Sequence, residues 1–400
     1  MALIQPYAAL LRTPHAFAPV TAAFLGRLPT GMMPLALVLF GYGASGSYAT
    51  AGRITAAYTI CSALFAPLQG RLVDRFGQTW PLVGSGVAHS AALVGLLIAA
   101  ATGAGSSMLT ALAGVAGLTY PPVSACMRAL WSELLDGDDQ RQTAYAFESV
   151  VIEISFFTGP LLVGLLAAVG SPSGAVLVAA TLAGGGALGF AASRPSRQWR
   201  AERADGAVRN ILGPLVSPGL RTILLISVPV GASFGVMDVA MPAFADAEGV
   251  PAAAGVLIAA ISVGSIPGGL WYGARRFSIP LSRQWAPLLG LTAAGLATLA
   301  LPNTIPQMAV LLALMGFTIA PGVTCALLLV DRVAPAGTLT EAFTWWTTAL
   351  VGGLAGGAYV AGIVTEHAGV DAALLSSSAA AAVAATLALL LRPSYDTQSA

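Results

Sequence analysis

Gly70-Arg71-Leu72-Val73-Asp74-Arg75-Phe76-Gly77-Gln78 is the stretch that decides the fold, a short charged segment between two long apolar runs. The preceding run covers residues 49–69, and the following run covers residues 80–102. A helix needs about 20 mostly apolar residues to cross the hydrocarbon core of a membrane, so both runs are long enough to span it. The charged segment therefore reads as a short loop that joins two spanning helices at one membrane surface.

The composition of the whole chain favours the same class. Of its 400 residues, 56% are hydrophobic and 9% are charged, whereas a soluble domain carries about 25% charged residues. Every basic residue is arginine, and the absence of lysine excludes a P-loop nucleotide site, because that loop needs its lysine to hold phosphate. The cysteines lie in apolar runs, as packing residues do. We expect no metal, no cofactor and no enzyme activity. The three cysteines are Cys61, Cys126 and Cys325.

The same length rule predicts twelve membrane-spanning helices along the chain. Their approximate ranges are 17–41, 49–69, 80–102, 107–132, 143–168, 174–192, 222–244, 252–272, 284–302, 306–330, 340–365 and 372–391. A longer polar segment with five arginines separates the sixth helix from the seventh. We therefore predict an N-terminal six-helix bundle in residues 1–192, a cytoplasmic linker in 193–221 and a C-terminal six-helix bundle in 222–400.

The placement of arginine predicts the orientation, because cytoplasmic loops of membrane proteins carry an excess of basic residues. With the N-terminus in the cytoplasm, 16 of the 18 arginines fall at cytoplasmic helix ends, and Arg27 and Arg53 lie within helices. No predicted outside loop contains arginine, and Asp246 and Glu366 are found there instead. The bias toward arginine, alanine and glycine favours a bacterial source. We expect a multi-pass protein of the bacterial inner membrane with both termini in the cytoplasm.

The sequence also repeats itself at half its length. Residues 51–57 match residues 254–260 at an offset of 203, and residues 117–119 match residues 316–318 at an offset of 199. The fifth predicted helix matches the eleventh at an offset of 198, where Gly159 aligns with Gly357. Three matches in order at nearly one offset indicate two related halves, as in many membrane transporters. The predicted fold class is an all-α membrane protein with two pseudo-symmetric six-helix bundles.

The charged loop resembles the loop signature of the major facilitator superfamily (MFS), in which a glycine, three residues and Asp-Arg precede one residue and a second glycine. The matching positions here are Gly70, Asp74, Arg75 and Gly77. Two later basic positions of the signature are lost at Gln78 and Thr79, and the equivalent segment of the second half has Phe277 where the aspartate would align. The resemblance implies the MFS fold over the whole chain, and transport by alternating access in a protein that works as a monomer.

The resemblance also implies a role for this loop. In the family layout, Asp74 lies near the start of the eleventh helix, around Thr340. A helix N-terminus attracts negative charge by about 0.3–1 kcal/mol, and Gly70 has no side chain to keep the helices apart. We predict a gate that holds the two bundles together on the cytoplasmic side. The alternative is a solvated loop whose charges serve only the orientation of the chain.

A second resemblance lies in the fifth helix, in the stretch from Thr158 to Gly164. Drug–proton antiporters of the superfamily carry a Gly-Pro-x-x-Gly-Gly motif there, and Gly159, Pro160 and Gly164 match it. The chain departs from the motif at Val163, and the arginine of the fourth helix that accompanies it in antiporters is missing. The resemblance implies proton antiport. The alternative is a simple kink and a tight helix contact.

Charged residues inside the predicted helices are candidates for substrate or proton sites. Such a group costs about 2.5–3.5 kcal/mol at the bilayer centre on insertion scales, so it usually marks a functional path. Arg27 and Glu153 lie at similar depths, and we expect them to pair. Arg128 and Glu148 match in depth nearer the cytoplasm, and we expect a structural pair there. Asp238 in the seventh helix has no obvious partner.

Proton coupling follows from this arrangement as a hypothesis. A conformational change that separates Arg27 from Glu153 would let the carboxylate take up a proton, and reunion would release it. A permanent structural ion pair is the alternative for these two residues. Asp238 could hold a proton or a cationic substrate. The arrangement therefore leaves open which carboxylate carries the proton.

Polar and aromatic residues limit the class of substrate. Asparagine and glutamine are nearly absent from the predicted helices, which argues against a sugar site, because sugar hydroxyls need many fixed hydrogen-bond partners. Tyr58 and Tyr120 lie in the middle of the second and fourth helices and are candidates for lining a cavity. Trp345 and Trp346 open the eleventh helix, and we expect them to be anchors at the membrane interface.

The sequence therefore predicts a secondary active transporter. We expect proton-coupled efflux of amphipathic drugs or metabolites from a largely apolar site. The partners are then a small-molecule substrate, protons and membrane lipid, with no nucleic acid. Two alternatives remain open. One is proton-coupled uptake of a small charged metabolite, and the other is a non-transporting sensor with a transporter fold.

Overall fold

The structure, a computed structural model, describes residues 5–135, 137–168, 172–201, 213–250 and 253–396. All regular structure in these ranges is helical. The elements are α1 (Gln5–Leu11), α2 (Phe17–Ser45), α3 (Tyr48–Phe76), α4 (Thr79–Ala101), α5 (Ser106–Leu118), α6 (Val123–Leu134), α7 (Asp138–Ala168), α8 (Pro172–Ala192), α9 (Arg194–Gln198), η1 (Gly213–Val216), α10 (Pro218–Ala247), α11 (Ala254–Ala274), α12 (Leu281–Thr298), α13 (Ile305–Gly316), α14 (Ile319–Val333), α15 (Leu339–Leu390) and η3 (Arg392–Ser394).

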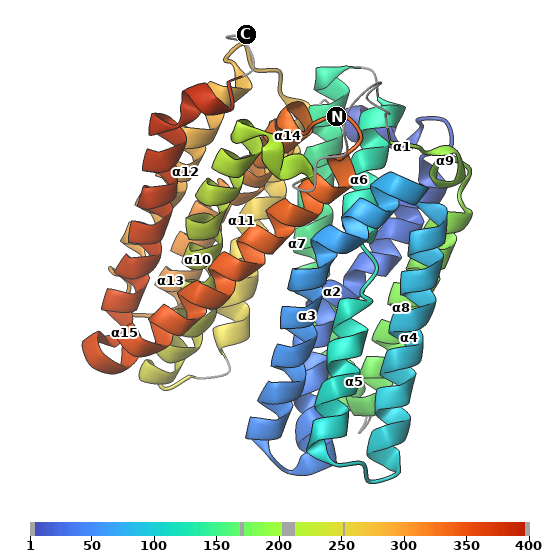
Figure 1. The fold of residues 1–400 in the computed structure, drawn as a ribbon. Coiled ribbons are helices and arrows are strands. Elements are labelled where there is room, and N and C mark those ends of the chain that lie inside the picture. The colour runs from blue at the N-terminus through green and yellow to red at the C-terminus, as the bar shows by residue number, and fades with distance from the viewer. Residues whose placement is uncertain (1–4, 136, 169–171, 202–212, 251–252, 397–400) are drawn as a thin grey trace.

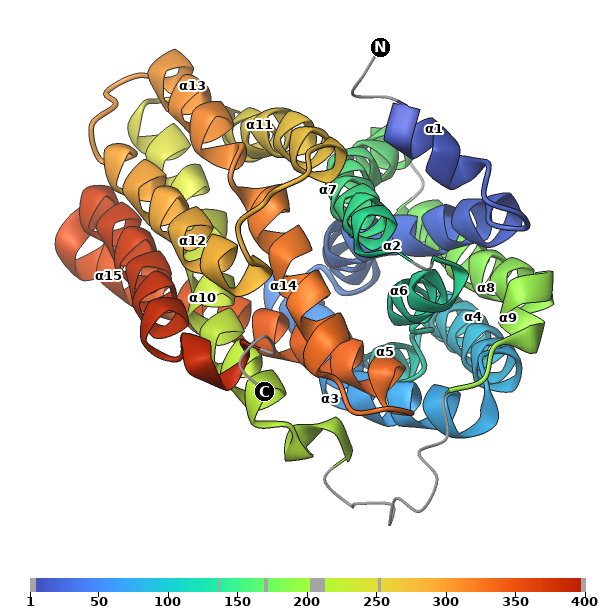
Figure 2. The ribbon, with the colours of Figure 1, turned by 90° about the horizontal axis from the view of Figure 1, so that it is seen from above.

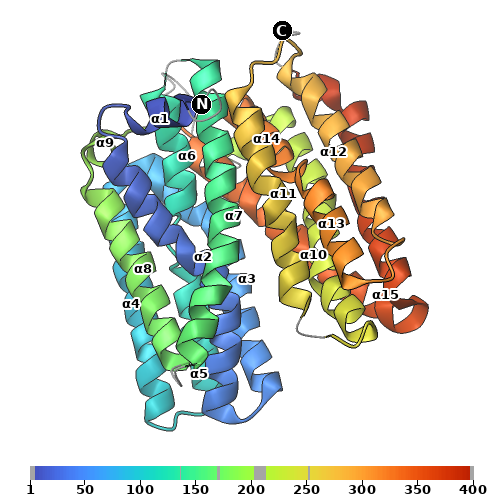
Figure 3. The ribbon, with the colours of Figure 1, turned by 180° about the vertical axis from the view of Figure 1, so that it is seen from behind.

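The long helices form two bundles (Figure 1). We call α2 to α8 the N-terminal bundle and α10 to α15 the C-terminal bundle. Both chain ends lie at the same end of the molecule, which we call the termini end, and the bundles diverge toward the opposite end (Figures 1 and 3). Seen from above, α7 lies beside α11 where the bundles meet (Figure 2). The proposed domain boundaries at residues 192 and 222 stay a prediction.

Each of the twelve predicted spans falls on a helix or a pair of helices. In the described chain, nine helical segments are long and apolar enough to cross a membrane. The segments α3 and α12 are not among these nine, and α15 contains both the eleventh and the twelfth predicted spans. The two arms of α15 meet at Gly369, whose φ of 85° lies in the left-handed region. The count of twelve spanning helices remains a prediction.

The predicted linker, residues 193–221, is only partly described. Its first part contains α9 and the buried side chain of Trp199, and its last part contains η1 and the start of α10. Two of its six arginines, Arg203 and Arg209, lie outside the described residues.

Two predicted spans are each broken at the same place in the repeat. The fourth span is divided into α5 and α6 at residues 119–122, and the tenth into α13 and α14 at residues 317–318. A break leaves backbone carbonyls without helical partners, and these must be satisfied by other groups inside a membrane. His89 Nδ1 lies 2.7 Å from the Ala116 carbonyl, and Gln69 donates to the Leu118 carbonyl at 2.6 Å. Side chains of neighbouring helices therefore support the break.

Close packing contacts of glycine within the N-terminal bundle recur at equivalent positions within the C-terminal bundle. Gly159 of α7 packs directly on Gly31 of α2, where an added Cβ would lie 2.6 Å from the Gly31 carbonyl carbon. At the equivalent place in the second bundle, Gly357 of α15 packs on Ala232 of α10. The two glycines are 198 residues apart, and their partners are 201 residues apart. The contact between the first and fifth helices of one bundle is therefore repeated in the other.

A second pair of contacts follows the same rule. Gly117 of α5 packs on the Tyr58 carbonyl of α3, and Gly316 of α13 packs on the Ile261 carbonyl of α11. The glycines are separated by 199 residues and their partners by 203 residues, close to the offsets found in the sequence. Small residues allow this approach of backbones, which is a main source of helix packing energy in lipid.

The helix-five glycines give a matched test of this packing. A Gly159→Val substitution should lower the free energy of unfolding in detergent by about 1–3 kcal/mol, because the new side chain meets the α2 backbone. Gly164→Val, five residues further along α7, should change it by less than about 0.5 kcal/mol, because Gly164 has open space around its Cα. Equal losses at the two positions would contradict the assigned contact.

Candidate functional site

The loop motif contacts the C-terminal bundle through Asp74. Its carboxylate accepts hydrogen bonds from two backbone N–H groups in the first turn of α15, from Thr340 at 3.1 Å and from Glu341 at 2.8 Å. These N–H groups have no acceptor within their own helix. The carboxylate supplies that acceptor and also places a negative charge at the positive end of the helix dipole. Asp74 therefore caps a helix that belongs to the other bundle.

Gly70 and Arg71 strengthen the same contact. A Cβ on Gly70 would lie 2.8 Å from the Glu341 Cα and 2.6 Å from Thr344 Oγ1, so only glycine permits this approach of α3 to α15. Arg71 donates to both carboxylate oxygens of Glu341, at 3.0 and 2.6 Å. The Glu341 carboxylate is buried and also accepts from Trp345 Nε1 at 3.3 Å. This bidentate ion pair was not anticipated from the sequence, although Arg71 lies inside the motif.

The other two motif residues lie on the outer side of this contact. The Arg75 guanidinium is exposed and lies 4.9 Å from the ring of the neighbouring Phe76. Gly77 has a φ of 81°, and its N–H donates to the Val73 carbonyl, so it ends α3 with a left-handed residue as glycine does at many helix ends. These two residues shape the loop, and these contacts are with Phe76 and Val73 of α3 and not with α15.

A second contact closes the other side of the junction, between α7 and α11. Gln142 donates to the carbonyls of Tyr272 and Arg275 at 2.7 and 2.8 Å, and Thr143 donates to the Gly273 carbonyl at 2.7 Å. These carbonyls lie at the C-terminal end of α11, where helical acceptors lack partners. Donors from the N-terminal bundle therefore cap the C-terminal end of α11, whereas Asp74 caps the N-terminal end of α15.

The short helix α1 takes part in this second contact. Tyr7 is buried, and its hydroxyl donates to the Leu270 carbonyl of α11 at 2.9 Å. Burial raises the pKa of Tyr7 well above its ordinary value, so the hydroxyl remains a donor at any physiological pH. Two ion pairs lie nearby, Arg332 with Asp138 at 2.6 Å and Arg276 with Asp139 at 2.7 Å. Because both aspartates are exposed, these pairs add little stability.

Glu153 lies deeper, about halfway along α7. Its carboxylate accepts hydrogen bonds from Ser262 Oγ at 2.6 Å and from Ser265 Oγ at 3.0 Å, both on α11 of the other bundle. The expected pair of Glu153 with Arg27 is wrong, because Glu153 faces α11 whereas Arg27 faces the interior of the N-terminal bundle. The two serines lie three residues apart, on one face of α11. A carboxylate at this depth therefore joins the two bundles.

Arg27 instead forms an ion pair with Glu148, and both side chains are almost fully buried. Glu148 also accepts from Trp131 Nε1 at 3.1 Å. Arg128 and Glu148, which we expected to pair, interact through their charges, but the direct ion pair of Glu148 is with Arg27. Arg128 lies over two aromatic rings of α15, at 5.9 Å from the centroid of Phe343 and 5.2 Å from that of Trp346.

Trp346 is buried, with 4% of its surface exposed, so it is a contact between the bundles and not the interface anchor that its place near a helix end suggested. Among the remaining candidates, Asp238 has an exposed side chain on α10. Tyr58 and Tyr120 lie inside the N-terminal bundle, with ring centroids 6.4 Å apart, and the Tyr120 hydroxyl lies 2.8 Å from that of Thr30. Their roles in binding stay predictions.

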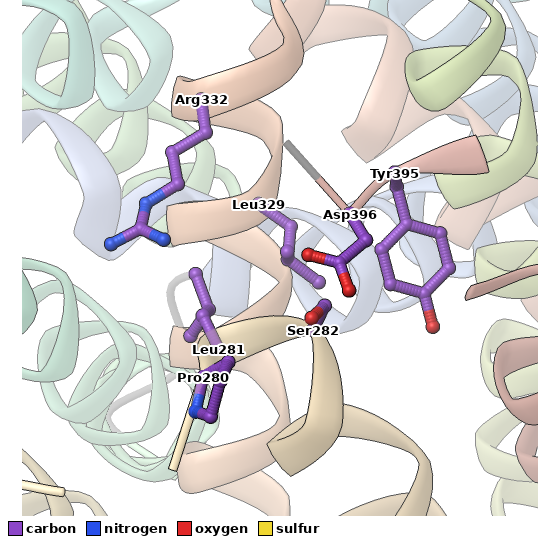
Figure 4. A pocket seen from close by; sticks show the side chains of 7 residues that line it. All are labelled: Pro280, Leu281, Ser282, Leu329, Arg332, Tyr395 and Asp396. Carbon is purple, nitrogen blue, oxygen red and sulfur yellow. The ribbon is translucent and has the colours of Figure 1, made fainter. Parts of the chain in front are cut away.

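Two hollows in the described chain lie away from these residues. One is a small pocket near the C-terminus (Figure 4), lined by Pro280, Leu281, Ser282, Leu329, Arg332, Tyr395 and Asp396. The other is an open apolar hollow of about 400 Å³ between α2 and α7, lined by Phe24, Leu28, Thr158, Leu161, Leu162 and Leu165. Neither contains a candidate charge from the membrane interior. The described residues contain no cluster of three or more histidine, cysteine or acidic side chains suited to a metal ion.

Several residues of the site were missed in the sequence. Gln142 and Thr143 lie at the start of α7, and Ser262 and Ser265 lie in an apolar helix, where single hydroxyls and amides are common. The spacing of the two serines places them on one helix face, which is the signal that could have indicated a shared partner. Glu341 follows directly after Thr340, the predicted target of Asp74. An acidic residue at that place was the signal that could have indicated an ion pair with Arg71 of the motif.

Comparison with known proteins places this arrangement in context. The family model described as Major Facilitator Superfamily matches residues 16–304. A curated relative, the uncharacterized MFS-type transporter y4rN of Sinorhizobium fredii (strain NBRC 101917 / NGR234), is 29% identical over 256 residues, which cover 60% of this chain and 60% of the relative. The match thus spans about three fifths of the length of that relative.

Solved structures with very different sequences share the fold. The human organic anion transporter MFSD10 (TETRAN) matches with a TM-score of 0.74 at 16% identity, over 94% of this chain and 99% of that one. A bacterial homologue of the iron transporter ferroportin, in an outward-facing state, gives 0.74 at 13% identity over 94% and 98%. The fucose:proton symporter FucP of E. coli gives 0.71 at 11% identity over 98% and 99%.

The cap formed by Asp74 predicts a change in accessibility. In a chain whose native cysteines are replaced by alanine, a Thr344→Cys side chain should react slowly with a polar maleimide, because Thr344 is buried between α3 and α15. Adding Asp74→Asn removes the charge on the helix end, which is worth up to about 2 kcal/mol, so labelling should become roughly three- to tenfold faster. Arg75→Gln, a neighbouring loss of charge, should leave the rate unchanged. Equal rates in the Asp74 variant and its parent would refute the cap.

Proposed function

The chain belongs to the major facilitator superfamily, and we propose that it is a secondary active transporter that exports amphipathic drugs or metabolites in exchange for protons. The family match and the shared fold of solved transporters support secondary transport. Proton coupling, direction and substrate are our proposals. The observation that carries them is the carboxylate of Glu153, which bridges the two bundles within the membrane.

The direction of opening follows from where the bundles touch. The caps at α15 and α11 and the Glu153 contact lie between the termini end and about the middle of the helices. We propose that the termini end faces the cytoplasm, which the distribution of arginine supports. The arrangement is then closed to the cytoplasm and corresponds to the outward-facing state of an alternating-access cycle. Breaking these contacts opens the cytoplasmic side.

Protonation of Glu153 supplies the coupling step. An ionised carboxylate makes charge-assisted hydrogen bonds with Ser262 and Ser265, and such bonds are roughly twice as strong as neutral ones. The ionised form therefore favours the state that is closed to the cytoplasm. A proton taken up from outside weakens both bonds and favours opening to the cytoplasm, where the proton is lost again. Inward proton movement thus resets the protein for the next export step, which is the sequence that antiport requires.

The apolar character of the helices supports the proposed substrate class. Asparagine and glutamine are nearly absent from the spans, so a sugar would find few fixed partners. Uptake of a small charged metabolite would need opposite charges at the two ends of one site. Arg27 and Asp238 are charges of opposite sign inside the predicted helices that an uptake site would use, but Arg27 is already paired with Glu148. The ion pair of Arg27 with Glu148 leaves Arg27 unavailable for such a site and therefore favours export over uptake.

Proton coupling predicts a specific defect in Glu153→Gln. In proteoliposomes loaded with a pH-sensitive dye, a gradient of a transported amphipathic compound should drive proton movement with the native protein. With the variant, proton movement should fall to the background rate, because glutamine cannot bind and release a proton. Exchange of labelled for unlabelled compound should continue, since exchange needs no net proton transfer.

Asp238→Asn is the matched control, because it removes another carboxylate that the sequence placed inside a predicted helix, and Asp238 lies on α10 and not on α7 or α11. It should retain proton movement. If the Asp238 variant loses coupling and the Glu153 variant keeps it, the assignment of the proton carrier is overturned. If the native protein moves no compound from a broad panel under any gradient, the sensor alternative replaces transport.

A further inference from the structure

Arg128 is a buried cation without a counterion of its own. Its residue is 2% exposed, and its Nε and Nη1 atoms have no hydrogen-bond partner among the described residues. Burying a guanidinium away from water costs several kcal/mol unless a partner compensates. An arginine in this position therefore needs an explanation beyond packing.

The carboxylates that face Arg128 or lie near it are already engaged. Glu148 is paired with Arg27 and accepts from Trp131. Both oxygens of Glu341 accept from Arg71. Both oxygens of Asp74 accept from the backbone of α15. Arg27 and Arg128 therefore share the single charge of Glu148, which forms its direct ion pair with Arg27, and the guanidinium of Arg128 lies over aromatic rings.

Those rings belong to the other bundle. Phe343 and Trp346 lie on the first turns of α15, the same turns that Asp74 caps. A cation over an aromatic face gains about 2 kcal/mol when both are desolvated, less than a charge-assisted hydrogen bond to an anion with good geometry. When α15 moves away on opening of the termini end, the rings leave with it. Arg128 then faces the opened space with an unpaired charge.

We infer that Arg128 is a capture site for the anionic group of the transported compound, formed only when the termini end is open. The ligand class is an amphipathic organic anion, with a carboxylate, sulfonate or phosphate group on an apolar body. The bidentate geometry of guanidinium suits all three groups. This inference rests on the proposed function, because it needs a state in which α15 has separated from α6.

The arrangement also gives the site a direction. In the closed state, Arg128 is 2% exposed and covered by Phe343 and Trp346 of α15, so an anion cannot reach its N–H groups. A ligand that binds one state better than the other shifts the population toward that state. Organic anions therefore bind from the cytoplasm and are displaced as the bundles close. The site cannot capture an anion from outside.

Binding to purified protein in lipid nanodiscs tests this inference without requiring transport. The probes are permanently charged aromatic sulfonates with one to three rings, each compared with the quaternary ammonium compound of the same ring system. Empty nanodiscs give the background from lipid partition. Asp74→Asn biases the protein toward the open state, and it also removes a carboxylate that opening frees on the same bundle as Arg128 and that would compete with the sulfonate.

We expect at least one sulfonate to bind the Asp74→Asn protein several-fold more tightly than the native protein. Adding Arg128→Gln should weaken that binding by roughly tenfold or more, because a charge-assisted contact is lost. Arg128→Lys, which keeps the charge but lacks the two parallel N–H donors of a guanidinium, should weaken binding less than Arg128→Gln does. Arg197→Gln, an equal loss of charge on the exposed surface of α9, should have no effect. Binding of the ammonium compounds should not depend on Arg128.

Sulfonate affinity that is the same with and without Arg128 in the Asp74→Asn background, or binding of no sulfonate at all, overturns the capture site. So does a loss of binding in Arg128→Lys equal to that in Arg128→Gln. These outcomes are distinct from failure of the proposed function. Arg128-dependent binding without any flux would retain the site and reject transport. Proton-coupled flux with sulfonate binding that is independent of Arg128 would retain transport and reject the capture site.

Discussion

A carboxylate that caps a helix from the opposite bundle is the interaction on which the closed arrangement depends. Asp74 binds backbone N–H groups of α15, so the contact requires that helix end to lie against α3 whatever side chains it carries. Gly70 makes the approach sterically feasible. The Arg71–Glu341 pair and the rings that cover Arg128 lie on the same first turns of α15. Because one rigid helix end carries all three contacts, they form and break together.

The sequence was most informative where a single physical rule applies to a whole segment. Lengths of apolar runs located the helices, and the repeat of Gly117 and Gly159 in Gly316 and Gly357 is matched by equivalent packing contacts. The resemblance of residues 70–78 to a known loop signature gave the target of Asp74 at Thr340. A target on the backbone depends on where a helix begins, which sequence patterns predict within a few residues.

The sequence was least informative about which side chains pair. Arg27 and Glu153 share a depth, but depth derived from residue counting says nothing about rotation around the helix axis. Glu148 and Glu153 are five residues apart, and at about 100° per residue they point to different sides of α7. Glu148 thus meets Arg27 in its own bundle, and Glu153 meets Ser262 across the junction. Only the packing of neighbouring helices fixes such choices.

The two flanks of the junction close by different chemistry. On the α3–α15 flank a formal charge meets a helix dipole, whereas on the α7–α11 flank amide and hydroxyl groups of Gln142 and Thr143 meet carbonyls. The first contact depends on a single helix end, whereas the second is spread over several carbonyls of α11 and is joined there by the Arg276–Asp139 ion pair and by the Glu153 contact. The junction between the two bundles is thus asymmetric, although the bundles themselves are pseudo-symmetric. A contact that depends on one helix end can be lost in a single step, so the bundles should separate first at α3–α15 and rotate about the more extended α7–α11 contact.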